Sequence, residues 1–153
     1  MAECIFCLID HGSIPASIVF RDERTLAFMD LNQPTRGHVL VIPHRHCVDL
    51  FDITPADAAA VMQTTRVLAA AVRRAVNADG IQLLQSNGKA ALQDVFHFHM
   101  HIFARFFHDD IARLGMRAAA KELPRAELDA LAKAIAEQLA AGGQSSTPAA
   151  ASH

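Results

Sequence analysis

The sequence predicts an α+β protein with an antiparallel sheet. Short β-rich segments fall into two groups, one before residue 44 and one after residue 80. A long amphipathic helix is expected between the groups and a second helix near the C-terminus, so strands and helices do not alternate as they do in a doubly wound fold. We therefore expect a meandering sheet of about five strands, with one long helix after the third strand and a C-terminal helix.

The first group of strands is delimited by residues that favour turns. Residues 18–21 are short and β-rich, residues 21–24 form a charged cluster typical of a turn, and residues 25–30 are expected to return as the hairpin partner. Residues 31–37 contain Asn, Pro and Gly, which favour a loop. Residues 38–43 follow as a strongly apolar strand that ends at its proline.

Two helices are predicted from a start signal and from apolar periodicity. Thr54 can cap the first helix, Pro55 suits its first position and Asp57 complements the helix dipole. Apolar residues then recur at helical spacing to about Asn77, before an Asp-Gly pair that can end the helix. The second helix is expected over residues 124–143, where leucine, alanine and isoleucine form one apolar stripe.

The second group of strands contains the most informative stretch of the chain. Residues 81–86 are expected to form a strand, residues 87–91 a turn and residues 95–103 another strand. Histidine occupies every second position of that last segment, at His97, His99 and His101. Side chains alternate between the two faces of a strand, so the imidazoles should share one face, and the apolar residues Phe96, Phe98, Met100 and Ile102 the other.

Burying three imidazoles without hydrogen-bond partners would lower the stability of the fold. Each polar group buried without a partner costs about 1–3 kcal/mol, so the histidine face is expected to line a cleft. Its chemistry is either metal binding or the presentation of one neutral imidazole as a nucleophile.

Length and charge narrow the class of protein. A chain of 153 residues suits one domain with a substantial core, which we place at residues 1–141, and residues 142–153 are expected to be a disordered tail. The net charge of -2 gives no basic field for nucleic acid. No apolar run approaches the roughly 20 residues of a membrane helix, and the N-terminal residues lack a charged region followed by a long apolar stretch. We therefore expect a soluble, cytoplasmic protein with no membrane or nucleic-acid partner.

The cysteines favour metal or redox chemistry over structural disulfides. There are three of them, at Cys4, Cys7 and Cys47, and the first two form a C-x-x-C pair. Two thiolates at this spacing can bind one zinc ion if two further ligands come from elsewhere. A thioredoxin-like redox pair is the alternative, although such a pair normally follows a strand.

Several motifs in register resemble the histidine triad (HIT) family, in its bacterial form with a C-x-x-C. The H-x-H-x-H run with apolar residues between and after the histidines is similar to the family signature. The other motifs follow the expected order along the chain: Cys4-Ile5-Phe6-Cys7, Ile14-Pro15-Ala16, Leu26-Ala27-Phe28-Met29-Asp30, Gly37-His38-Val39-Leu40-Val41-Ile42-Pro43 and His46. The resemblance covers nearly the whole chain up to Arg105 and implies the HIT-like fold.

The resemblance implies nucleotidyl hydrolysis or transfer. His99 would attack the α-phosphorus of a purine nucleoside phosphoramidate, a dinucleoside polyphosphate or a related conjugate, and water would release the nucleoside monophosphate, with AMP as the expected moiety. The backbone carbonyl of His97 would hold the tautomer of His99, and His101 would donate to a phosphate oxygen. Gln93 would hold the phosphate or leaving group, and His38 would orient the triad. The alternative is a nucleotide-binding or interaction protein with little turnover.

The resemblance also implies a nucleotide pocket with two departures from the family pattern. Asp30 matches the position that binds ribose hydroxyls, and the apolar walls around the base would be Ile5, Phe6, Ile9, Phe28 and Leu31. Asp94 stands where the family often has Ser or Thr, and is expected to face a cationic leaving group or to activate water. Ser86 stands where Asn or Gln is frequent, so a phosphate contact is expected to be lost or to move to Asn87.

A structural zinc site and a homodimer are implied in the same way. The zinc ligands would be Cys4, Cys7, His46 and His97, which would tie the N-terminus to the histidine strand. His44 is a less favoured fourth ligand. No catalytic metal is expected, because three histidines on one short strand are spaced too widely to converge on one ion.

Overall fold

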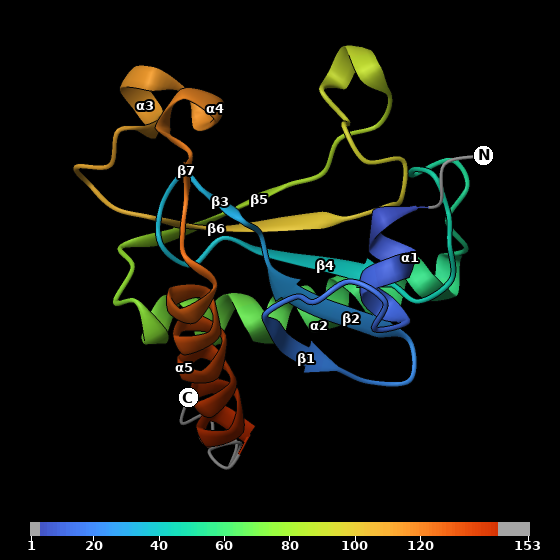
Figure 1. Cartoon of the computed structure of the whole chain (residues 1–153), viewed down its shortest axis with the longest axis horizontal. Coiled ribbons are helices and arrows are strands. Elements are labelled where there is room, and N and C mark those ends of the chain that lie inside the picture. The colour runs from blue at the N-terminus through green and yellow to red at the C-terminus, as the bar shows by residue number, and fades with distance from the viewer. Residues whose placement is uncertain (1–3, 144–153) are drawn as a thin grey trace, which may run out of the picture.

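A five-stranded antiparallel sheet forms the centre of the protein in the computed structural model, which describes residues 4–143 (Figure 1). Its strands are, in spatial order, β1 (Ile18–Arg21), β2 (Thr25–Met29), β4 (Val39–Pro43), β6 (Met100–Arg105) and β5 (Gly80–Leu84). All four neighbouring pairs are antiparallel. The predicted α+β class, the five strands and the two long helices are confirmed.

The strand order departs from a simple meander at one place. β1, β2 and β4 follow one another as predicted, and the helix α2 (Pro55–Ala75) then leads the chain to the far edge of the sheet, where β5 lies. β6 returns between β5 and β4. His101 on β6 is consequently paired with Leu40 on one side and with Leu84 on the other, in the middle of the sheet.

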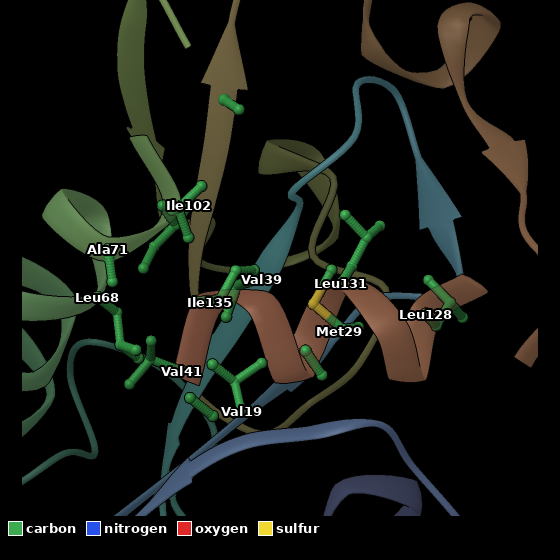
Figure 2. Packing of buried hydrophobic residues seen from close by; sticks show 14 of the residues in the cluster. Val19, Met29, Val39, Val41, Leu68, Ala71, Ile102, Leu128, Leu131 and Ile135 are labelled. Atoms are coloured by element: carbon green, nitrogen blue, oxygen red, sulfur yellow. The ribbon is translucent and has the colours of Figure 1, made fainter. Parts of the chain in front are cut away.

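Two long helices cover one face of the sheet. α2 begins where predicted: the Thr54 hydroxyl accepts a hydrogen bond from the Asp57 backbone N–H at 3.1 Å, and a proline occupies the first turn. α5 (Arg125–Gly143) packs against α2 and β1. The main core lies between these helices and the sheet (Figure 2); among its members are Val19, Met29, Val39, Val41, Leu68, Ala71, Ile102, Leu128, Leu131 and Ile135.

The opposite face of the sheet carries a smaller core under the short helix α1 (Ile5–Asp10). Alternation along β2 and β4 directs a second set of side chains to this face, namely Leu26, Phe28, Leu40 and Ile42, and Phe6 of α1 covers them. The sequence does not predict this helix, because six residues are too few for helical periodicity to be recognised. α1 brings the C-x-x-C pair to the same face as the histidines.

The histidine strand is shorter than predicted. β6 begins at Met100, and residues 95–97 form a bend. The Phe98 N–H donates to the carbonyl of Cys47 at 2.7 Å, so this part of the segment is held by a loop and not by a strand. Alternation nevertheless persists, since Phe98 and Ile102 lie in the main core whereas Phe96, 41% exposed, departs from the predicted apolar face.

The remaining elements are short. The predicted loop over residues 31–37 contains β3 (Asn32–Gln33), which pairs with β7 (Lys121–Glu122) in a separate two-stranded sheet. The predicted turn after β5 contains a 3-10 helix at Lys89–Ala91, and two four-residue helices, α3 (Ile111–Leu114) and α4 (Met116–Ala119), follow β6. The predicted tail lies outside the described residues from residue 144 onward, and α5 extends through Gly143. None of the helices within residues 4–143 is long and apolar enough to cross a membrane.

Candidate active site and metal cluster

The backbone of His97 determines the tautomer of His99. His99 Nδ1 lies 2.6 Å from the carbonyl oxygen of His97. Because a carbonyl can only accept, Nδ1 must carry the proton and donate it, and the neutral ring then has its lone pair on Nε2. Phe6 from α1 packs edge-on against the His99 ring with 5.2 Å between centroids, which holds the ring in place.

The lone-pair nitrogen of His99 makes no hydrogen bond within the described residues, although the residue is almost entirely buried. The Nε2 atom of His101 likewise has no hydrogen-bond partner among residues 4–143, and His101 is partly exposed. The two rings are neighbours, with 4.8 Å between centroids.

His101 is linked to His38, the residue just before the neighbouring strand β4. His38 Nε2 lies 2.9 Å from His101 Nδ1, and His38 Nδ1 lies 2.7 Å from the carbonyl oxygen of Asn32. Asp30 is close as well, with a carboxylate oxygen 3.7 Å from His38 Nδ1. The His38 ring also stacks on Phe103, with 4.1 Å between centroids.

Burial keeps both members of this pair uncharged at neutral pH. Burial lowers the pKa of His38, against the opposing effect of Asp30. Burial, followed by the neighbouring His38 and His99, lowers the pKa of His101 to about 3.

Four side chains from three separated segments converge next to the triad. Their ligand atoms all lie within 4.8 Å of one another, and we name the group the cysteine–histidine cluster: Cys4, Cys7, His46 and His97. The Sγ of Cys7 lies 3.4 Å from His46 Nδ1 and 3.6 Å from His97 Nδ1, and the Sγ of Cys4 lies 3.5 Å from His97 Nδ1. Sulfur and nitrogen ligands of one tetrahedral zinc ion stand about 3.5 Å apart, given bond lengths of about 2.3 and 2.0 Å. The separations in the cluster therefore fit a metal ion of this kind.

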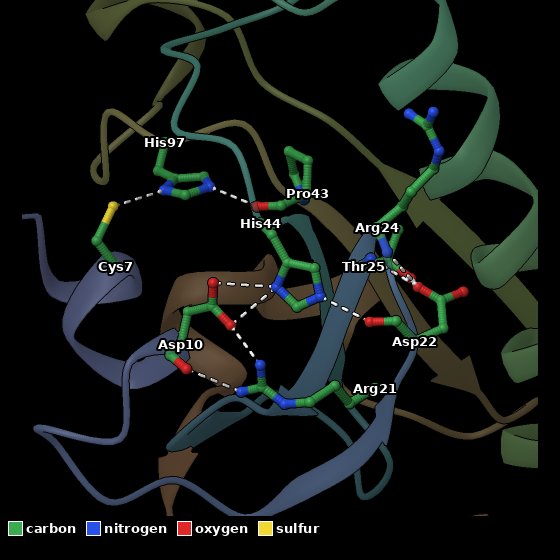
Figure 3. Close-up of polar contacts among 9 residues, drawn as sticks. All are labelled: Cys7, Asp10, Arg21, Asp22, Arg24, Thr25, Pro43, His44 and His97. Carbon is green, nitrogen blue, oxygen red and sulfur yellow. Dashed lines mark hydrogen bonds and ion pairs between the residues drawn. The ribbon is translucent and has the colours of Figure 1, made fainter.

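His97 is oriented for metal binding by its other ring nitrogen. His97 Nε2 donates to the carbonyl oxygen of Pro43 at 3.0 Å, which leaves the lone pair on Nδ1, the atom that faces the thiols (Figure 3). Burial, opposed in part by the Pro43 hydrogen bond, lowers the pKa of His97 to about 4, so the ring is neutral at pH 7 as a metal ligand must be.

His44 belongs to a different network, which sequence reasoning did not anticipate. His44 Nδ1 lies 2.9 Å from a carboxylate oxygen of Asp10, and His44 Nε2 donates to the carbonyl of Asp22 (Figure 3). Arg21 forms an ion pair with Asp10 at 2.7 Å. Asp10 ends α1, so this network anchors the helix that carries both cysteines. The only sequence signal for it was a carboxylate three residues after the C-x-x-C.

The predicted apolar walls fall into two groups. Ile5 and Leu31 are 46% and 44% exposed and are therefore available to a ligand. Phe6 and Phe28 are buried in the smaller core with 5.4 Å between their centroids, and Ile9 packs at its margin. For these three residues, core packing explains the position without a ligand.

The predicted phosphate contacts are mostly engaged with the protein itself. Gln93 Oε1 accepts from the Gly88 N–H at 2.7 Å, and its Nε2 donates to the carbonyl of Val48 at 2.7 Å and to that of Val95 at 3.2 Å. Gln93 thus holds the loop before the triad with both ends of its amide, and its contact with a phosphate stays a prediction.

The other predicted polar contacts, Ser86, Asn87 and Asp94, differ in whether their side chains are already hydrogen-bonded within the protein. The side chain of Asn87 accepts from the Leu50 N–H at 2.7 Å and exchanges hydrogen bonds with Gln85, so it too is engaged. Ser86 is half-buried beside it. Asp94 is exposed and accepts a hydrogen bond from the next backbone N–H, that of Val95, at 3.0 Å, which leaves its other oxygen for solvent or a ligand.

Comparison with known proteins identifies the family. A family model described as "HIT domain" matches residues 11–108, well over half of the chain. The chain belongs to the HIT family. A HIT relative from Bacillus subtilis, "Protein hit", is 36% identical over 137 residues, which cover 90% of this chain and 94% of that protein. Adenylylsulfatase HINT3 from Arabidopsis thaliana is 35% identical over 103 residues, which cover 67% of this chain and 52% of that protein.

A solved HIT structure matches the fold and contains zinc. It is a zinc-bound histidine triad family protein from Mycobacterium smegmatis, 33% identical, with a TM-score of 0.81 and coverage of 93% of this chain and 96% of that one. HIT proteins form a superfamily of nucleotide-binding hydrolases and transferases, and this chain is a member of it.

Proposed function

We propose that this HIT protein is a nucleotidyl hydrolase or transferase that works through a covalent nucleotidyl-His99 intermediate. Its substrate would be a purine nucleoside phosphoramidate, a dinucleoside polyphosphate or a related nucleotide conjugate. The observation that carries the proposal is the 2.6 Å contact between His99 Nδ1 and the His97 carbonyl, which leaves the lone pair on Nε2 without a partner in the described residues. A relative named as an adenylylsulfatase supports an adenylyl compound as the substrate class.

The reaction would proceed in two displacements at one phosphorus atom. His99 Nε2 forms a bond to the α-phosphorus while the bond from phosphorus to the leaving group breaks, and the leaving group departs with its electron pair and takes up a proton. A water oxygen then forms a bond to phosphorus, the bond to Nε2 breaks, the water proton is released, and the nucleoside monophosphate leaves with His99 restored. The His97 carbonyl stabilises the positive charge that develops on the ring during attack.

The nearby residues would bind the nucleotide on either side of His99. We assign the phosphate to His101, whose ring lies beside that of His99 and whose Nε2 has no hydrogen-bond partner among residues 4–143. Asp30 would accept from ribose hydroxyls, and the exposed Ile5 and Leu31 would contact the base. Asp94 would face a cationic leaving group, because a carboxylate beside a phosphate is repelled by it.

The proposal is tested by following AMP release from adenosine 5′-phosphoramidate, diadenosine tetraphosphate and adenylyl sulfate. We expect release from at least one of them, and its loss in His99→Gly. Intact-mass spectrometry after rapid quenching in alkaline denaturant, which preserves the acid-labile P–N bond, should find a single added adenylyl group in the wild type and none in the variant. His108→Gln, an exposed histidine outside the site, is the matched control. Normal turnover by His99→Gly would refute the proposal.

A nucleotide-binding protein with little turnover is the second candidate. The engagement of Gln93 and Asn87 with the protein favours it, because fewer side chains then remain to stabilise the transition state. It predicts tight binding of AMP without hydrolysis of any phosphoramidate or polyphosphate. Sustained AMP release from any of these substrates would exclude it.

We further propose that the cysteine–histidine cluster binds one zinc ion with a structural role. The donor set and separations fit zinc, and all four protein ligands close the coordination shell. Bound zinc would join α1, the loop at His46 and the segment before β6, and would supply no reaction chemistry. Mass-spectrometric metal analysis should find one zinc per chain in the wild type and less than half in Cys7→Ser.

A homodimer is proposed through the free edge of the sheet. β5 is an edge strand that exposes Leu83 and Leu84, and a second copy could continue the sheet there. Light scattering during gel filtration should give twice the mass of the chain, and the double substitution Leu83→Lys and Leu84→Lys should give the mass of one chain. A monomeric wild type would refute this assignment.

A further inference from the structure

The hydrogen bonds around His38 and His101 fix the position of each proton in the uncharged pair. The carbonyl of Asn32 can only accept, so His38 Nδ1 carries a proton and, in a neutral ring, His38 Nε2 has the lone pair. At 2.9 Å, His101 Nδ1 must then donate to that lone pair. The remaining nitrogen of a neutral His101, Nε2, is left as an acceptor.

This state of the pair is unsuited to an anionic ligand. His99 and His101 then present two lone pairs to the same space, and a phosphate oxygen finds no donor from either ring. The alternative neutral arrangements place two lone pairs against each other, either at the 2.7 Å contact between His38 and Asn32 or at the 2.9 Å contact between the rings. One extra proton removes the conflict, because His101 Nε2 then becomes a donor while every other hydrogen bond is kept.

We propose that a nucleotide phosphate bound beside His99 draws one proton from solvent onto the His38–His101 pair and thereby turns His101 into its hydrogen-bond donor. The inference rests on the proposed placement of the phosphate at His101. His38 is a positioning residue in this scheme, since it acts on the ligand through His101. The proton comes from buffer or water, and it returns there when the nucleotide leaves.

A positive charge on the His38–His101 pair would lie between two negative groups, Asp30 on the protein side and the phosphate on the cleft side. Asp30, 3.7 Å from His38 Nδ1, is the charged group that faces the pair from the loop after β2, and the phosphate would face it from the cleft. His99 faces it from the segment before β6, with its Nδ1 proton donated to the His97 carbonyl. Leu40 of β4, Leu84 of β5 and Phe103 of β6 also adjoin the pair and add no charge.

The test is titration calorimetry with adenosine 5′-methyl phosphate. This diester keeps a single negative charge across the neutral range, so it neither gains nor loses protons itself, and methoxide is a poor leaving group. The binding enthalpy is measured near pH 7 in buffers with different ionisation enthalpies. The slope of the binding enthalpy plotted against the ionisation enthalpy of the buffer gives the number of protons exchanged, and it should show about one proton taken up per site. The affinity for the diester should fall about tenfold for each pH unit above neutrality.

Two variants should bind the phosphate without taking up a proton, because in each of them a hydrogen-bond donor can face the phosphate while the pair stays uncharged. In His38→Gln the amide nitrogen can donate to His101 Nδ1, so a neutral His101 can carry its proton on Nε2. In His101→Gln the amide donates to the phosphate without titrating. Both variants should bind the diester with uptake near zero and little pH dependence, whereas His108→Gln should keep the uptake of the wild type. If buried His38→Gln does not fold, the partly exposed His101→Gln still decides the matter.

The outcomes distinguish this inference from the proposed function. Uptake near zero in the wild type, or unchanged uptake in His101→Gln, would overturn the inference even if the adenylyl adduct on His99 forms. Proton uptake without any AMP release would support the inference and count against the catalytic proposal. Absence of binding by the diester would overturn the placement of the phosphate, and with it the inference.

Discussion

Acid should destabilise this protein through His101, by an amount that the structure allows us to calculate. The pKa of His101 is about 3 in the folded chain, and that of an unfolded histidine is about 6.5. Between these values the unfolded chain binds a proton that the folded chain does not, so stability falls as pH falls below about 6.5 and is unaffected above it. The loss is about 1.4 kcal/mol for each pH unit, or about 2 kcal/mol between pH 7 and pH 5.

Urea denaturation at the two pH values measures this loss as a difference between variants. Protonation of the cysteine–histidine cluster also lowers the stability of the wild type in acid, and this effect cancels when the wild type is compared with His101→Gln. The wild type should lose about 2 kcal/mol more than His101→Gln on going from pH 7 to pH 5. His108→Gln should behave as the wild type does, because this side chain is exposed. Equal losses in the wild type and in His101→Gln would show that His101 is not held uncharged in the folded protein.

Three further predictions follow from individual contacts. Thr54→Ala should lower the free energy of unfolding, measured by denaturation, by about 1 kcal/mol, because the α2 cap is lost. Thr54→Ser should keep most of the wild-type stability, because the serine hydroxyl can still cap the helix. Gln93→Leu leaves the Gly88 N–H and the Val48 carbonyl without their partner, so it should cost about 1–3 kcal/mol for each of these groups that stays buried, in the same assay. Chelation of the metal should lower the melting temperature and expose α1 to proteolysis, whereas Cys47→Ala, outside the cluster, should leave the metal content unchanged.

The features that local chemistry determines were predictable from the sequence. Thr54, Pro55 and Asp57 carry the start of α2 in their own side chains, and the alternation of β4 follows from the pleat. The four members of the cysteine–histidine cluster came from resemblance, and their convergence in the structure is consistent with that expectation.

Features that depend on distant partners were not predictable in the same way. The placement of β6 between β4 and β5 depends on where α2 leads the chain, which no local signal encodes. The contact between His38 and His101 joins residues 63 positions apart. The amide of Gln93 is held by three backbone groups, of Gly88, Val48 and Val95, and no local signal in the sequence indicates these contacts.

The side chain and the backbone of His97 have separate roles, one in the cysteine–histidine cluster and the other in the hydrogen bond to His99. Its imidazole faces the thiols, whereas its main-chain oxygen holds the proton of His99. Mutagenesis replaces a side chain but leaves the peptide oxygen in place, so His97→Ala removes a metal ligand and keeps the tautomer of the neighbouring ring. Variants at this one position can therefore show whether metal loss harms the chemistry directly or only by loosening the segment on which the oxygen sits.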